Sequence, residues 1–96
     1  MDDLDLDLAR RNARIRAWRA YGLPIRGRWA RSMIQTPILD AQCLTCRQSY
    51  SVWWDAFNQK LVPPYKPCEH ILPFFTDEDP PEVLALIALE LLAGGS

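Results

Sequence analysis

The residues of this chain best suited to chemistry are its three cysteines and its single histidine. They form two close pairs, Cys43 with Cys46 and Cys68 with His70, and 21 residues separate the pairs. Each close pair can span one edge of a ligand tetrahedron, and a loop of this length can fold the pairs together. Thiolate and imidazole are ligands that zinc prefers in proteins. The spacing therefore predicts one structural Zn2+ held by all four residues.

Other uses of the cysteines fit the spacing less well. An iron–sulfur cluster would use four thiolates, and covalent haem would need a histidine where Arg47 follows Cys46. A thioredoxin-like redox pair at Cys43 and Cys46 would leave the second pair without a role. Inert buried thiols are the remaining alternative.

The fourth ligand is the least certain part of this site. Only one residue separates His70 from Cys68, which is tighter than the usual spacing, so Glu69, Asp77 or water could replace the imidazole. Four candidate ligands favour a closed coordination shell, whereas a catalytic zinc keeps one position open. The order of ligands also differs from the His-x-Glu and Cys-x-x-Cys order of the nucleobase deaminases. With no glycine-rich phosphate loop and no nucleophile pair, we expect a protein that is not an enzyme and has no small-molecule substrate.

Length and composition set the frame for such a site. A chain of 96 residues makes one domain and buries only about 60–70% of its unfolded surface. A structural zinc contributes on the order of 10 kcal/mol and would stabilise a small core. The first residues are rich in aspartate rather than basic, no apolar run approaches a membrane span, and the cysteine count is odd. We therefore expect a cytoplasmic protein in a reducing compartment, without contact to a membrane.

Residues 4 to 21 form the first predicted helix, with acidic residues in its first turn and Gly22 and Pro24 at its end. Two stripes of apolar side chains run along this predicted helix. The larger stripe contains Leu4, Leu8, Ile15 and Trp18, and the second contains Ala9, Ala13, Ala17 and Ala20. We expect the large stripe to pack on the zinc module and the alanine stripe to accept another helix.

Charge is strongly segregated along the chain. Residues 1 to 9 carry four acids and no base, residues 10 to 47 carry nine arginines against Asp40 alone, and residues 48 to 96 are acidic. Acidic partners at helical spacing are missing beyond Asp7, so we expect the arginines to bind an external anion. Residues 22 to 37 form a predicted basic arm, whose Trp29 either stacks on bases or packs on the core. The candidate contacts are Arg10, Arg11, Arg14, Arg16, Arg19, Arg26, Arg28, Arg31 and Trp29.

Residues 38 to 76 form the predicted zinc module. A short strand enters the Cys43 turn, the alternation in residues 48 to 54 predicts a second strand, and residues 60 to 62 return after a turn. A turn with two ligands followed by a hairpin indicates a zinc ribbon. The glycine common after the second cysteine is replaced by Arg47, so a treble-clef or irregular variant is the alternative.

The last predicted helix covers residues 80 to 93, after the acidic residues 77 to 79, and residues 94 to 96 form a tail. Its side chains are apolar on every side apart from Glu90, so it needs more cover than a small domain supplies. A dimer, a partner protein or the alanine stripe could cover it. The candidate interface residues are Val83, Leu86 and Leu89.

The sequence thus predicts an α+β fold: one zinc-stabilised domain over residues 1 to 96, with a zinc-ribbon-like centre between an arginine-rich helix and an apolar helix. As its function we expect binding to nucleic acid or a nucleoprotein complex through the arginines. The alternative is a protein-interaction module, such as a small regulator or inhibitor that docks on a larger protein machine and presents its arginines to an acidic surface. In either case we expect a homo-oligomer or a hetero-complex.

Overall fold

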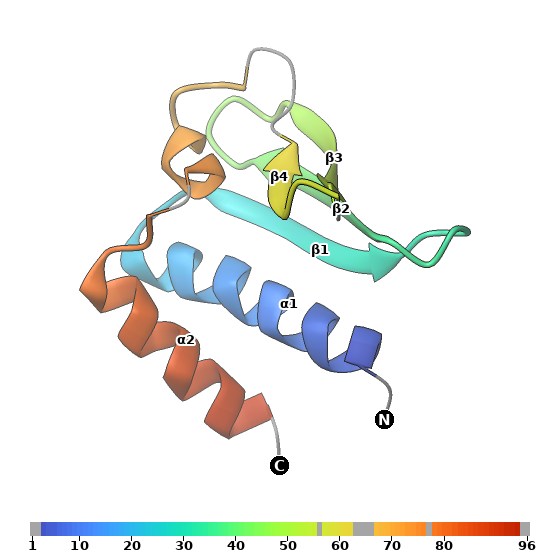
Figure 1. Ribbon diagram of the computed structural model, residues 1–96. Helices are drawn as coiled ribbons and strands as arrows, with labels where there is room; N and C mark the ends of the chain where they lie inside the picture. Colours follow the sequence, from blue (N-terminus) through green and yellow to red (C-terminus); the bar gives the residue numbers. More distant parts are fainter. Residues whose placement is uncertain (1–2, 56, 63–66, 77, 95–96) are drawn as a thin grey trace.

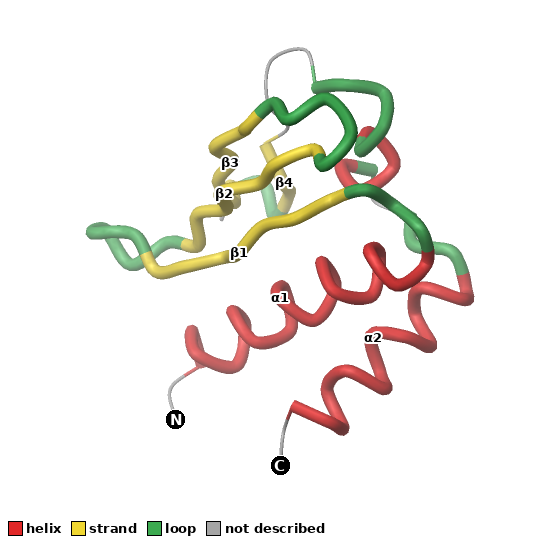
Figure 2. The backbone as a smooth tube through the Cα atoms, turned by 180° about the vertical axis from the view of Figure 1, so that it is seen from behind, coloured by secondary structure: helices red, strands yellow, loops and turns green. Residues whose placement is uncertain are grey.

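The computed structural model describes residues 3–55, 57–62, 67–76 and 78–94. The fold is α+β, with one helix packed on one side of an antiparallel sheet of four strands and a second helix packed against the first (Figure 1). Seen from behind, both helices again lie together below the sheet (Figure 2). Within the described part of the chain, no helix is both long and apolar enough to cross a membrane.

Helix α1 spans Asp3–Tyr21 and begins one residue before the helix predicted over residues 4 to 21. Asp3 and Asp5 lie in its first turn, where negative charge stabilises the positive end of the helix dipole. Gly22 follows the last helical residue and adopts a φ of 124° that L-residues rarely take. The N–H of Leu23 donates to the carbonyl oxygen of Trp18 at 3.0 Å, which completes the glycine-terminated cap.

The sheet has the strand order β1-β2-β3-β4. The strands are β1 (Ile25–Arg31), β2 (Pro37–Cys43), β3 (Ser49–Asp55) and β4 (Lys60–Val62). In register, Arg28 faces Asp40 of β2, which in turn faces Ser51 of β3. The strands expected on both sides of the Cys43 turn and the short returning strand are therefore present.

The structure differs from the expected basic arm, because most of that segment is the edge strand β1. Ile25 and Trp29 are buried in the core, while Arg26 and Arg28 are exposed. This alternation is the period of a strand with one buried face. Gly27 allows close approach to β2, since a Cβ there would lie 2.7 Å from the backbone oxygen of Asp40.

The chain after β4 covers the core. Residues Leu72–Phe75 form the 3-10 helix η1, and both Ile71 and Phe74 are fully buried. Helix α2 spans Pro81–Gly94 and packs against α1. A single core cluster joins side chains of α1, three strands, η1 and α2.

Helix α2 crosses α1 over its alanines. Ala13 and Ala17 are fully buried, while the ion pairs Arg14–Asp79 and Arg16–Glu90 flank them on either side. Small side chains let two helix backbones approach closely, which explains why α2 settles here. Helix α1 therefore supplies part of the cover that the apolar helix needs, with Ala13 and Ala17 of the alanine stripe buried and Ala9 and Ala20 exposed.

Candidate functional site

The two pairs of metal-ligand candidates meet at one end of the sheet. The ligand atoms of Cys43, Cys46, Cys68 and His70 all lie within 4.8 Å of one another. Cys43 is the last residue of β2, Cys46 lies in the turn to β3, and the second pair precedes η1. Four side chains from two distant segments thus form one cluster that could hold a metal ion.

The turn that carries the first pair is fixed by backbone hydrogen bonds. The N–H of Arg47 donates to the carbonyl oxygen of Cys43 at 2.8 Å, and the N–H of Cys43 donates to that of Gln48 at 2.9 Å. Arg47 has a φ of 63°, so it takes the left-handed conformation that a glycine would adopt more easily. The N–H of Leu44 donates to the carbonyl oxygen of Pro24 at 2.8 Å, which ties this turn to the start of β1.

Tyr50 holds the second pair in place, a role that its position in the sequence does not predict. Its hydroxyl oxygen accepts the N–H of Cys68 at 2.9 Å, and its O–H donates to Gln48 Oε1 at 2.6 Å. Tyr50 stands near the start of the strand that leaves the Cys46 turn. Its partner is a backbone N–H 18 positions further along the chain, so no local sequence pattern indicates this contact.

The surroundings of the thiols favour the thiolate at two of them. Burial raises the pKa of Cys43, but hydrogen bonds from the backbone N–H groups of Cys46 and Thr45 outweigh it and lower the pKa to about 7. Burial also raises the pKa of Cys68, and a hydrogen bond with His70 reverses this, so that the net shift is downward. A backbone hydrogen bond from Gln48 lowers the pKa of Cys46, but desolvation and the other two thiols leave it raised.

The geometry of the cluster fits a tetrahedral ion. Metal–sulfur bonds of about 2.3 Å place the ligand atoms of a tetrahedral zinc roughly 3.7 Å apart, so the observed spread needs only a small contraction. Cys43 is buried and Cys68 half-buried, while Cys46 and His70 are exposed. Among the described residues Glu69 is not part of the cluster, and Asp77 lies outside the described residues.

The arginines expected to bind an external anion fall into separate groups. Arg11 lies between α1 and the sheet, with its guanidinium carbon 4.2 Å from the ring centre of Trp54 and 5.0 Å from that of Trp29. It also bonds Asp7 at 2.8 Å. Arg14 pairs with Asp79 and lies over the ring of Phe74. The structure uses both side chains to hold the fold together.

Two further arginines form ion pairs at the surface. Arg16 bonds Glu90 and Arg31 bonds Asp5, each at 2.8 Å. The acids that pair with Arg14 and Arg16 come from the C-terminal segment, which is why no partner was visible at helical spacing. Within the described residues, no ion pair involves Arg10, Arg19, Arg26 or Arg28.

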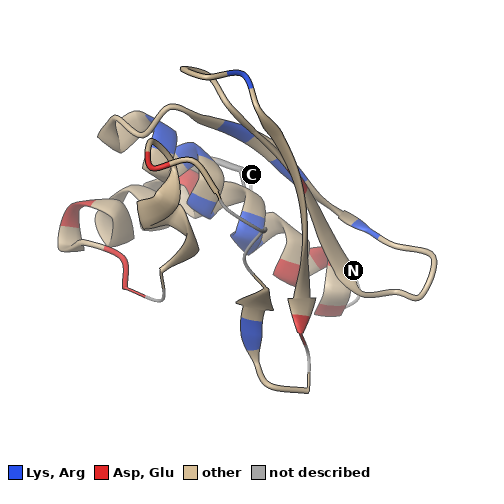
Figure 3. Cartoon of the chain, turned by 90° about the horizontal axis from the view of Figure 1, so that it is seen from above, with Lys and Arg blue, Asp and Glu red and all other residues tan. Residues whose placement is uncertain are grey.

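Arginines of α1 and β1 come together at one groove. Arg16, Arg19 and Arg28 line a hollow of about 370 Å³, which also contacts Asn12 and Gly27. We call it the basic groove. Basic residues occur along both α1 and β1, while several acids lie at the start of α1 and in the C-terminal segment (Figure 3).

Trp29 is not available for stacking on a ligand, which corrects one of the two expectations for it. Only 4% of its surface is exposed, and it belongs to the core. Its backbone N–H donates to Asn12 Oδ1 at 2.7 Å, and its carbonyl oxygen accepts Asn12 Nδ2 at 3.2 Å. The expectation that Trp29 packs on the core is the one that the structure supports.

The candidate interface residues of α2 do not share one environment. Val83 is fully buried in the core and Leu86 packs against it, so Val83 cannot contact a partner. Leu89 is 61% exposed, and Leu84 and Leu92 are exposed beside it. The apolar face that α1 leaves uncovered therefore differs from the set expected from the sequence.

Together these features define an α+β protein with a Cys3His cluster. Comparison with known proteins adds no relative, since no protein-family model, curated protein or solved structure matches the chain.

Proposed function

We propose that this protein is a non-enzymatic, zinc-stabilised module that binds nucleic acid through its basic groove and the neighbouring Arg26. The observation that carries the proposal is the convergence of Arg19 and Arg28 on one groove without an acidic partner among the described residues. A guanidinium group without an acidic partner can bind phosphate through two parallel hydrogen bonds.

Zinc is the ion that the ligand set favours. Three thiolates and one imidazole are a common set for structural zinc, whereas iron–sulfur clusters use four thiolates. Four protein ligands leave no position for a substrate, which favours a structural role. The turn at Cys43 and the β2–β3 hairpin also support a zinc-ribbon-like module, in which the second pair comes from the segment after β4.

The number of arginines without an acidic partner determines how many phosphates the protein can contact and how strongly its affinity depends on salt. Four of the eight arginines between positions 10 and 31 have partners within the chain, so the groove and Arg26 supply about three phosphate contacts. With three contacts, log affinity should fall against log salt with a slope between about −2 and −3. Specificity for sequence is expected to be small, because phosphate contacts do not read bases.

The test replaces two groove arginines and compares an equal loss of charge elsewhere. We expect the double change Arg19→Gln and Arg28→Gln to weaken binding at least tenfold and to flatten the salt slope by up to about two units. The control double change, Arg10→Gln and Lys60→Gln, removes the same charge outside the groove and should have little effect. The absence of binding to any nucleic acid near about 0.1 M salt would overturn the proposal.

A second candidate function follows from the uncovered face of α2. Leu84, Leu89 and Leu92 are 55%, 61% and 77% exposed, and the two acids of α2 are Glu82 in its first turn and Glu90, which pairs with Arg16. An apolar surface of this kind can pack on a copy of itself, so a second copy of this chain is its simplest partner. In this alternative the protein is an interaction module, and Leu89→Lys should convert a dimer into a monomer in sedimentation experiments. A wild-type chain that sediments as a monomer at high concentration would contradict it.

A further inference from the structure

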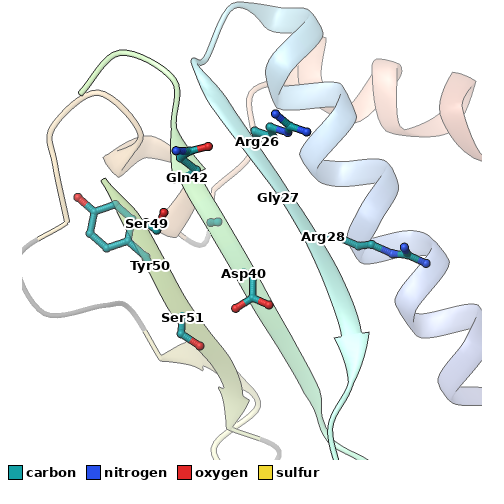
Figure 4. A pocket seen from close by; sticks show the side chains of 9 residues that line it. Arg26, Gly27, Arg28, Asp40, Gln42, Ser49, Tyr50 and Ser51 are labelled. Carbon is teal, nitrogen blue, oxygen red and sulfur yellow. The ribbon is translucent and has the colours of Figure 1, made fainter. Parts of the chain in front are cut away.

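The sheet face opposite to α1 carries ordered rows of polar side chains. One row crosses Arg26, Gln42 and Ser49, and the next crosses Arg28, Asp40 and Ser51, because these residues are paired in register. Figure 4 shows the polar side chains of β2 and β3 at this face, while Arg26 and Arg28 extend from β1 toward α1. We call this surface the open face.

The open face is hollow and polar. The two rows line a cleft of about 600 Å³ that is open to solvent. Its side chains offer hydroxyl, amide and guanidinium groups, and Asp40 is the one acid among the residues lining it. Because Arg26 and Arg28 stand on β1 and Arg28 also lines the basic groove, positive charge continues from the cleft toward α1. The cleft therefore offers hydrogen bonds at its floor and cations at one rim.

An exposed tryptophan, Trp53, lies in the next row of the same sheet face, after the row of Arg28, Asp40 and Ser51. Trp53 is 54% exposed and faces Ile38 in the next row of the sheet. With Ile38, Met33 and Ile34 it lines a second, apolar hollow of about 410 Å³. The other three tryptophans differ, since Trp18 and Trp29 are buried and Trp54 lies under Arg11. Trp53 is thus the tryptophan whose ring can receive a ligand.

We propose that the open face binds single-stranded nucleic acid, with a base stacked on Trp53 and the phosphates following Arg26 and Arg28 toward the basic groove. This inference rests on the proposed function and names its partner. Unpaired bases expose their aromatic faces and their hydrogen-bonding edges, which a duplex keeps inside its stack. A sheet surface with one aromatic ring, polar side chains and a cationic rim matches these groups.

The dimensions agree with a short single strand. From the Arg26 row to the Trp53 row the face extends about 13 Å along the strands, since each residue advances about 3.3 Å. This length holds a few splayed nucleotides rather than a helical turn of duplex. An extended peptide would more often pair with a strand edge, but Asn12 already occupies the Trp29 backbone at the β1 edge. The arginines at the rim favour nucleic acid over a peptide, and the bonds between Asn12 and the Trp29 backbone disfavour a peptide at the β1 edge.

The test compares three probes of equal length, a single-stranded DNA, a single-stranded RNA and a DNA duplex, by fluorescence anisotropy at about 0.1 M salt. We expect either single strand to bind at least tenfold more tightly than the duplex and to quench tryptophan emission. Trp53→Ala should remove this quenching and weaken single-strand binding about tenfold. Phe57→Ala is the matched control, because Phe57 is an aromatic residue exposed by 92% in the turn after β3 and outside the open face.

A second variant keeps the inference testable if the loss of Trp53 disturbs folding. Ser51→Glu adds a negative charge to the cleft at an exposed position and should weaken single-strand binding, whereas Ser51→Lys should strengthen it. Equal binding to duplex and single strand, or unchanged affinity of the Trp53→Ala variant, would overturn this inference and leave the proposed function standing. Binding of a peptide or protein in place of any nucleic acid would overturn both.

Discussion

Arg14 and Asp79 lie 65 positions apart in the chain and form the most extensively bonded ion pair among the described residues. Arg14 Nε lies 3.0 and 3.1 Å from the two carboxylate oxygens, and Nη2 lies 2.8 Å from Oδ1. Trp18 Nε1 donates to the same carboxylate at 3.0 Å. Arg14 Nη2 also donates to the carbonyl oxygen of Phe74 at 2.9 Å. The pair therefore joins α1, η1 and the start of α2 at one point.

Asp79→Asn should destabilise the protein by about 2 to 3 kcal/mol. The side chains of Asp79 and Arg14 are only 16% and 23% exposed, so removing the negative charge leaves a poorly solvated guanidinium. The matched control is Glu90→Gln, which breaks the Arg16 pair at the surface. That pair is 36% and 43% exposed, so its loss should cost less than about 0.5 kcal/mol. Chemical denaturation measures both, and equal effects would contradict the central role of Asp79.

This pair also shows why the sequence predicts the helices and strands better than it predicts the partners of the arginines. Helical periodicity and terminal glycine predict α1 closely, since these signals are local. The partners of Arg14 and Arg16 lie 65 and 74 positions away, and no local pattern brings them together. An arginine run without nearby acids therefore resembles a ligand-binding surface, although half of its side chains have structural contacts.

The sequence of β1 contains the alternating pattern of a strand, but its high arginine content favoured the prediction of a basic arm. Ile25, Gly27 and Trp29 alternate with arginines at period 2, which is typical of a half-buried strand. The composition suggested a flexible arm instead. The four metal-ligand candidates were easier to find, because their residue types are rare in this chain and their spacing restricts the geometry. Tyr50 acts through a backbone hydrogen bond, and such a bond leaves no trace in residue type.

Metal removal should unfold the protein. We expect the purified chain to contain about one zinc and to lose its cooperative thermal transition in chelator, because a structural zinc supplies much of the folding free energy of a small domain. Cys46→Ser should have the same effect. Glu69→Gln should keep the metal, since Glu69 is not in the cluster. A metal-free protein that still melts cooperatively would contradict the structural role, and equal metal loss in the Glu69 variant would contradict the assignment of His70.

Tyr50→Phe should weaken zinc binding by about tenfold without changing the ligand set. The variant leaves the N–H of Cys68 without its acceptor, so the backbone that carries this ligand is held less firmly. Competition with a chromophoric chelator measures the affinity. Tyr21→Phe is the matched control, because Tyr21 is 48% exposed at the end of α1 and removed in sequence from the cluster. Equal affinity of the Tyr50 variant and the wild type would show that Tyr50 does not position the site.

Arg47→Gly should stabilise the metal-loaded protein by about 0.5 kcal/mol. Arg47 follows Cys46 with a φ of 63°, and an L-residue in this conformation loses roughly 1–2 kcal/mol relative to the right-handed region. Glycine removes this strain but loses more chain entropy on folding, which offsets part of the gain. Arg47→Ala is the matched control, since it removes the same charge and keeps the Cβ. Denaturant unfolding with zinc present should therefore rank glycine above arginine, with alanine close to arginine. If alanine stabilises as much as glycine, the guanidinium charge beside the cluster is the cause and backbone strain is not.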